Sequence, residues 1–228
     1  MENPNLSFEL CKPEHYPSLN ALMELCFSDL KGGYAPEEEI ETLSRLYPRG
    51  QIVCVLDGKV IGANLSRIVP FEAFRKPHTQ EDCIDQSRFE FDAAIGDSVY
   101  GLDVFVHPDY QNLKVGKQIV ELFVKNVFED NFYCMMGICR VVNYPAHMHE
   151  MDCETYALKV KNKELYDPCL SFHVRNGMEY VNVSPGFCED DISSAGYGVI
   201  MASYNPAYDP SKPAKKPMEL ELRGVLVA

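Results

Sequence analysis

The stretch from Tyr100 to Phe128 constrains the fold most, because the spacing of its apolar residues changes within it from that of a strand to that of a helix. The alternation over residues 99–106 predicts a strand. It assigns one face to Tyr100, Leu102, Val104 and Val106, and the other face to Gly101, Asp103 and Phe105. Pro108 ends the strand, and from Val115 the apolar residues follow the 3.6-residue period of an amphipathic helix. The stretch therefore predicts a strand–loop–helix unit.

The loop of this unit predicts an anion site. The first amides of a helix lack partners within the helix and carry partial positive charge, which suits a phosphate. Lys114 and Lys117 add cations here, and no acidic residue stands in the first turn, where one is usual. The alternative is that any strand–loop–helix unit has such a terminus and that the lysines are only solvated.

The segment DVFVHPDYQNLKVGKQIV, residues 103–120, resembles the acyl-coenzyme A signature of the GNAT acyltransferase superfamily. That signature is Gln or Arg, two residues, Gly, one residue, then Gly or Ala. Gln111 and Gly116 match it, and Lys114 stands where the first glycine is usual. A basic residue there is common in the GNAT-like domain that precedes a nitrilase-type carbon–nitrogen hydrolase domain in some bacterial two-domain proteins. LYDPCLSFHVRNGM (165–178) and GYGVIMASYNPAY (196–208) also resemble that branch.

The resemblance, which covers residues 7–208, implies an α/β (α+β) fold with a mixed, mostly antiparallel central sheet flanked by helices. It also implies acetyl-CoA or another acyl-CoA as cofactor. The pantetheine arm would lie between two splayed central strands and pair with the backbone of Val104, Phe105 and Val106. The apolar run over residues 133–142 predicts the second of these strands. The phosphates would bind the loop and helix start, at Gln111, Asn112, Leu113, Lys114, Val115, Gly116 and Lys117.

The resemblance implies direct acyl transfer to a primary amine, which needs a base and a proton donor. Asp103 is the candidate base, because a carboxylate on a covered strand should have a raised pKa. The alternative is a structural aspartate bonded to a neighbouring loop. His173 stands where the superfamily often has a tyrosine that protonates the leaving thiolate, and histidine can donate a proton near neutral pH. It could instead be bonded to a backbone carbonyl, and Tyr166 is a neighbouring alternative donor.

The rest of the chain predicts one domain over residues 1–205. Two helices begin near Pro17 and Pro36, and a hairpin turns at Asp57-Gly58. Residues 70–98 show no sustained period and predict an insertion or long loop. In the resembled fold the first two helices and the segment 70–98 border the acceptor, so Tyr34 is implied to contact it. Residues 206–228 predict a linker and a tail with an extra strand, which could pair with its own sheet or with that of a neighbouring copy in a homodimer.

The composition disfavours several partners. A net charge of −13 disfavours nucleic acid and anionic membranes and is compatible with a cationic amine substrate. The alternative is that the acidity only keeps the protein in solution. No apolar run spans a bilayer and no signal pattern opens the chain, so we expect a cytoplasmic protein. The nine cysteines lack a CxxC spacing, and His147, His149 and Glu150 lack metal-ligand spacing, so we expect reduced thiols and no metal.

Two functions remain open from the sequence. The first is an acyl-CoA-dependent N-acyltransferase for a small-molecule or peptide amine. The second is a catalytically weak or silent acyl-CoA-binding module that regulates a nitrilase-type amidase partner. Gln111, Gly116 and the basic helix start favour the enzyme, whereas the missing tyrosine and missing first glycine favour the module.

Overall fold

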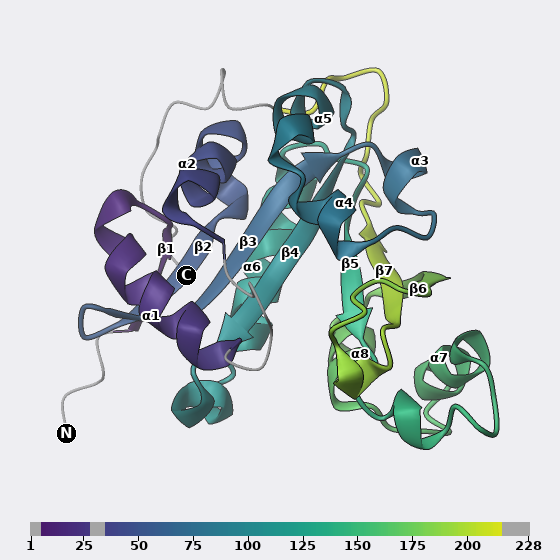
Figure 1. The fold of residues 1–228 in the computed structure, drawn as a ribbon. Helices are drawn as coiled ribbons and strands as arrows, with labels where there is room; N and C mark the ends of the chain where they lie inside the picture. Colours follow the sequence, from purple (N-terminus) through teal and green to yellow (C-terminus); the bar gives the residue numbers. More distant parts are fainter. Residues whose placement is uncertain (1–5, 28–34, 216–228) are drawn as a thin grey trace.

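The computed structural model describes residues 6–27 and 35–215. Tyr34 and the expected tail strand lie outside these ranges. Within them, one seven-stranded sheet runs through the molecule in the order β1-β2-β3-β4-β5-β7-β6 (Figure 1). All neighbouring strands are antiparallel except β4 and β5, which are parallel, so the predicted mixed, mostly antiparallel sheet is confirmed. The strands are β1 (Leu6–Leu10), β2 (Ile52–Leu56), β3 (Lys59–Val69), β4 (Ser98–Val106), β5 (Cys134–Arg140), β6 (Glu179–Ser184) and β7 (Gly198–Tyr204).

Helices cover both faces of the sheet. One face carries α1 (Tyr16–Cys26), α2 (Glu37–Leu46), α3 (Phe71–Phe74), α4 (Gln80–Ile84) and α5 (Phe89–Ile95). The other carries α6 (Val115–Glu129), α7 (Cys153–Lys161) and α8 (Pro168–Arg175), whose apolar side chains form the largest core cluster with β5 and β7. The helices predicted near Pro17 and Pro36 and from Val115 are therefore present, as is the hairpin, whose Asp57 and Gly58 both have positive φ.

Residues 70–98, predicted as an insertion or long loop, fold into α3, α4 and α5 with short connections. These helices have four, five and seven residues, which is too short to show a helical period. A buried ion pair between Arg67 of β3 and Asp92 of α5 fastens the segment to the sheet. Arg67 also donates 2.7 Å to the carbonyl of Cys83, so this one side chain joins α4 and α5 to β3.

A β-bulge in β4 corrects the predicted alternation of this strand. Leu65 of β3 pairs with Asp103 and Ser66 pairs with Gly101, so Leu102 is an extra, unpaired residue. Tyr100 packs among α3 and α4, on the same side as Phe105, which packs against α1. Val104 and Val106 pack instead against the start of α6. The prediction that Tyr100, Leu102, Val104 and Val106 share one face is wrong, because the bulge reverses the alternation after Leu102.

The start of the predicted linker lies against the domain. Asn131, which follows α6, donates 3.0 Å to the carbonyl of Asp209 and 2.9 Å to that of Lys212. The amide of Lys215 donates 2.8 Å to the carbonyl of Asp130. Residues 206–215 are thus hydrogen-bonded to the turn between α6 and β5.

Candidate active site

The two parallel central strands separate within the sheet. Hydrogen-bonded pairing joins Val99–Gly101 of β4 to Met135–Gly137 of β5 and goes no further, although both strands continue. A Cβ on Gly137 would lie 3.0 Å from the carbonyl oxygen of Gly101, so a glycine is needed at this close approach. Beyond it, β4 and β5 leave an opening in the sheet, which is the splay that the sequence resemblance implies.

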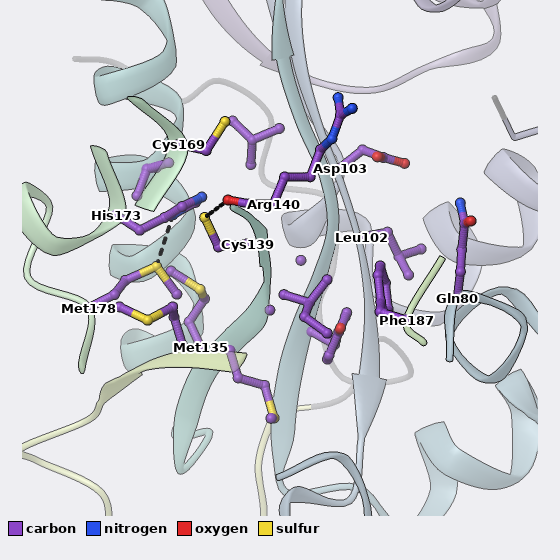
Figure 2. Close-up of a pocket in the computed structure, with 18 of the residues that line it drawn as sticks. Gln80, Leu102, Asp103, Met135, Cys139, Arg140, Cys169, His173, Met178 and Phe187 are labelled. Atoms are coloured by element: carbon purple, nitrogen blue, oxygen red, sulfur yellow. Dashed lines mark hydrogen bonds between the residues drawn. The ribbon is translucent and has the colours of Figure 1, made fainter. Parts of the chain in front are cut away.

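A cavity of about 240 Å³ passes through this opening. On the α4 side it is lined by Gln80, Ile84, Leu102 and Phe187, and on the α6 and α8 side by Phe123, Met135, His173 and Met178. Figure 2 shows these two walls, with His173, Met178, Met135 and Cys139 on one side and Leu102, Gln80 and Phe187 on the other. The cavity therefore connects the two faces of the sheet.

Asp103 lies in this cavity, on β4 directly after the bulge. Burial, with a further contribution from the negative charge of Glu39, raises the pKa of its carboxyl from 3.8 to about 7. Among the described residues, none donates a hydrogen bond to this carboxyl. The alternative of a structural aspartate bonded to a neighbouring loop therefore finds no partner among these residues. A carboxyl with this pKa is partly ionised at neutral pH and can accept a proton.

His173 lies in the same cavity, on α8. Burial lowers the pKa of its imidazole to about 4, and its Nδ1 is 3.2 Å from Sδ of Met178. The ring is therefore neutral at pH 7. Because a thioether sulfur can only accept, Nδ1 carries the ring proton, and Nε2 remains as an acceptor with no proton to give. Tyr166 precedes α8, is 60% exposed and is not part of the cavity lining. Asp103 and His173 thus line the same cavity, whereas Tyr166 lies outside it.

The position of α8 depends on Asp167, as the Asp-Pro helix start predicts. Its Oδ1 accepts 3.0 Å hydrogen bonds from the amides of Cys169 and Leu170, which caps the helix. Its Oδ2 accepts from the amide of Asn143 at 3.0 Å and from the hydroxyl of Tyr156 at 2.9 Å. This buried carboxylate therefore ties the start of α8 to α7 and to the loop after β5.

The predicted phosphate loop forms a 3₁₀ turn, η4 (Pro108–Leu113), that leads into α6. Lys114 has φ of 60° and ψ of 21°, a left-handed conformation, which explains why the superfamily signature favours glycine here. A Cβ on Gly116 would lie 3.4 Å from Val106 and 3.8 Å from Phe172, so the helix start closely approaches β4 and α8.

The side chains of this loop differ in their availability. Gln111, Asn112, Leu113 and Lys114 are exposed, whereas Val115 is fully buried and can offer only its backbone. Lys117 forms an exposed ion pair with Glu121 at 3.5 Å. The amides at the start of α6, the left-handed Lys114 and the splay beside Val104, Phe105 and Val106 fit the phosphates and arm of an acyl-CoA.

Several cavity residues have no signal in the sequence. Gln80 and Ile84 come from α4, and Phe187 comes from the loop between β6 and β7. Arg140 ends β5 and is held by Asp191, with Nε to Oδ2 at 2.8 Å and Nη2 to Oδ1 at 2.7 Å. For Arg140, the sequence offers one sign, which is a charged residue at the end of an apolar strand. Gln80, Ile84 and Phe187 lie in short segments without a period, so the sequence gives no sign of them.

Residues 6–27 and 35–215 show neither a cluster of metal ligands nor a membrane-spanning helix. No group of three or more His, Cys, Asp or Glu side chains in these ranges is arranged to hold a metal ion. Nδ1 of His147 instead lies 3.7 Å from Oε2 of Glu150. None of the helices described is long and apolar enough to span a membrane.

A family model described as the acetyltransferase (GNAT) family matches residues 16–151, which is more than half of the chain. The chain belongs to the GNAT family. Among curated proteins it is 27% identical over 172 residues to the uncharacterized N-acetyltransferase YkwB of Bacillus subtilis, covering 75% of this chain and 76% of the relative. It is 29% identical over 182 residues to the probable hydrolase YhcX of the same organism, covering 79% of this chain. The chain spans only 36% of the length of YhcX.

Solved structures show the same fold. The GphF GNAT-like decarboxylase in complex with isobutyryl-CoA matches with a TM-score of 0.71 and 21% identity, covering 86% of this chain and 98% of that one. The loading GNATL domain of CurA from Lyngbya majuscula matches with a TM-score of 0.71 and 24% identity, covering 87% and 97%. The ribosomal-protein-S18-alanine N-acetyltransferase of Escherichia coli matches with a TM-score of 0.55 and 10% identity, covering 91% and 99%. These likenesses confirm the predicted GNAT fold.

Proposed function

We propose that this GNAT protein is an acyl-CoA-dependent N-acyltransferase that transfers an acyl group directly to a primary amine. The observation that carries the proposal is Asp103, a carboxyl with a pKa of about 7 inside a cavity that passes through the sheet at the splay. The splay suits a thioester donor on one side, and the cavity leaves a separate approach for the acceptor past Gln80 and Ile84 on the other.

The backbone of β4, Asp103 and His173 have different roles in the proposed transfer. Alternate backbone amides of an antiparallel strand point away from its partner, so part of Val104–Val106 offers donors to the splay rather than to β3. Such donors polarise a thioester carbonyl placed there. Asp103 accepts the proton of the amine, which is otherwise mostly protonated at neutral pH. His173 directs its one N–H at Sδ of Met178, so the neutral ring leaves only the acceptor nitrogen Nε2 for the substrate, and the departing thiolate takes up its proton from solvent.

Binding and turnover test the proposal separately. Unfolding temperature is measured with and without acyl-CoA, and release of free thiol is then measured over a panel of primary amines. We expect a thermal shift with the cofactor and thiol release with at least one amine. Asp103→Asn should lower turnover and spare cofactor binding. Asp57→Asn, at the exposed hairpin turn, is the matched control. No thermal shift at millimolar acyl-CoA would refute the proposal.

The second candidate is an acyl-CoA-binding or regulatory module that acts with a nitrilase-type amidase. The match to the probable hydrolase YhcX, in which the similar region makes up about a third of the protein, supports this candidate. A neutral His173 in place of a proton donor also favours it. A thermal shift without thiol release across a broad amine panel, together with co-purification of an amidase, would favour the module. Sedimentation would show whether the protein is a homodimer.

A further inference from the structure

The cavity continues past the level where β4 and β5 meet. Met135 pairs with Val99, below the opening, and yet it belongs to the cavity lining. On the α6 side of the sheet, side chains of α6, β5, β7 and the residue before β6 surround this lower part. We call it the closed end, and its side chains are Val120, Phe123, Met135, Met178 and Met201.

The closed end is apolar and well covered. Its five side chains are between 1% and 6% exposed, and none of them carries a charge or a hydroxyl. Three of them are methionines, whose flexible thioethers adapt to ligands of different shape. The imidazole of His173 borders this space through its contact with Met178. An aliphatic group suits such walls, whereas water and charged groups do not.

An acyl-CoA that lies along β4 with its phosphates at the start of α6 points its acyl group toward the closed end. Gly116 approaches Val106 at the phosphate end of the splay, and Gly101 approaches Phe123 at the other end, where an added Cβ would lie 3.3 Å from the ring. β4 therefore runs from the phosphate end to the closed end over Val106 to Gly101, about 17 Å of strand. An acyl chain that continues past a carbonyl near Val104 in this direction enters the closed end.

We propose that the closed end is an acyl-chain chamber and that the donor of this protein carries a short aliphatic chain longer than acetyl. Met135, which lines the chamber, stands two strand residues, roughly 7 Å, below Gly101, and we take this length as room for a chain of about four to six carbons. An acetyl group would leave it empty. This inference rests on the proposed acyl-CoA-dependent function.

Affinity as a function of chain length tests the chamber. Titration calorimetry on the whole chain would compare free CoA with acetyl-, butyryl-, hexanoyl- and decanoyl-CoA. Burial of one methylene is worth up to about fourfold in affinity, so we expect butyryl-CoA to bind about tenfold more tightly than acetyl-CoA. Affinity should stop rising between hexanoyl- and decanoyl-CoA. Equal affinities, or tightest binding of acetyl-CoA, would overturn the chamber and leave the proposed function intact. Failure of free CoA and of every acyl-CoA to bind would overturn both.

Filling the chamber gives the second test. Met178→Phe should reduce the preference for hexanoyl- over acetyl-CoA at least fivefold while affinity for free CoA stays within twofold. Ile84→Phe, on the opposite wall of the cavity, is the matched control and should leave the chain-length preference unchanged. Met201→Phe fills the chamber from β7 and replaces Met178→Phe if that variant does not fold. The chamber is refuted if the filling variant keeps the wild-type preference or if Ile84→Phe changes it equally.

Discussion

Replacing Asp103 by asparagine should change how the stability of the protein depends on pH. The carboxyl has a pKa of about 7 in the folded protein and 3.8 as its reference value. The folded state therefore binds this proton more tightly than the unfolded state. At pH values between the two pKa values the unfolded state releases more protons, so stability falls as pH rises. The raised pKa corresponds to roughly 4 kcal/mol in total, and more than half of this loss of stability falls between pH 5 and pH 8.

Urea unfolding at pH 5 and pH 8 measures this effect. The wild type should lose roughly 2 to 3 kcal/mol more than Asp103→Asn over this interval, because asparagine does not ionise and the other titrating groups are shared. Asp57→Asn should follow the wild type. If Asp103→Asn and the wild type agree to within about 0.5 kcal/mol, the carboxyl is hydrated in the folded state and the argument for Asp103 as a base fails. In a turnover assay, the same group predicts a rate that rises with pH to a plateau above about pH 7.

Three further predictions concern the elements around the cavity. Asp167→Ala should lower the free energy of unfolding by about 3–5 kcal/mol in urea titrations, because two helix amides, a loop amide and the hydroxyl of Tyr156 lose their acceptor. A loss below about 1 kcal/mol would contradict this role. Lys114→Gly should raise stability by about 1 kcal/mol, since glycine adopts positive φ without strain, and should weaken CoA binding most at low salt. Unchanged stability would count against strain at this residue. The imidazole of His173 should give the nitrogen NMR shifts of a neutral ring from pH 5.5 to pH 8, because burial lowers its pKa to about 4. A protonated ring at pH 6 would contradict the neutral role proposed for it.

The sequence by itself determined the regular elements that surround the cavity. The change of period after Pro108 located β4 and α6, because alternation and the helical repeat are properties of neighbouring residues. The Asp-Pro start located α8 in the same way, since a helix cap is a local contact. Val104–Val106 lie beside the splay and Gln111–Lys117 lead into α6, and their contact with an acyl-CoA stays a prediction.

Only the tertiary structure decided which side chains meet. The bulge at Leu102 depends on the register of β4 against β3, and it alone places Asp103 on the side of Glu39. The neutral state of His173 depends on burial, which no local pattern reports. The three short helices of residues 70–98 carry no period, and buried contacts from Arg67 hold two of them, α4 and α5. The sequence therefore determined the framework, while the cavity was decided by register, burial and contacts between distant segments.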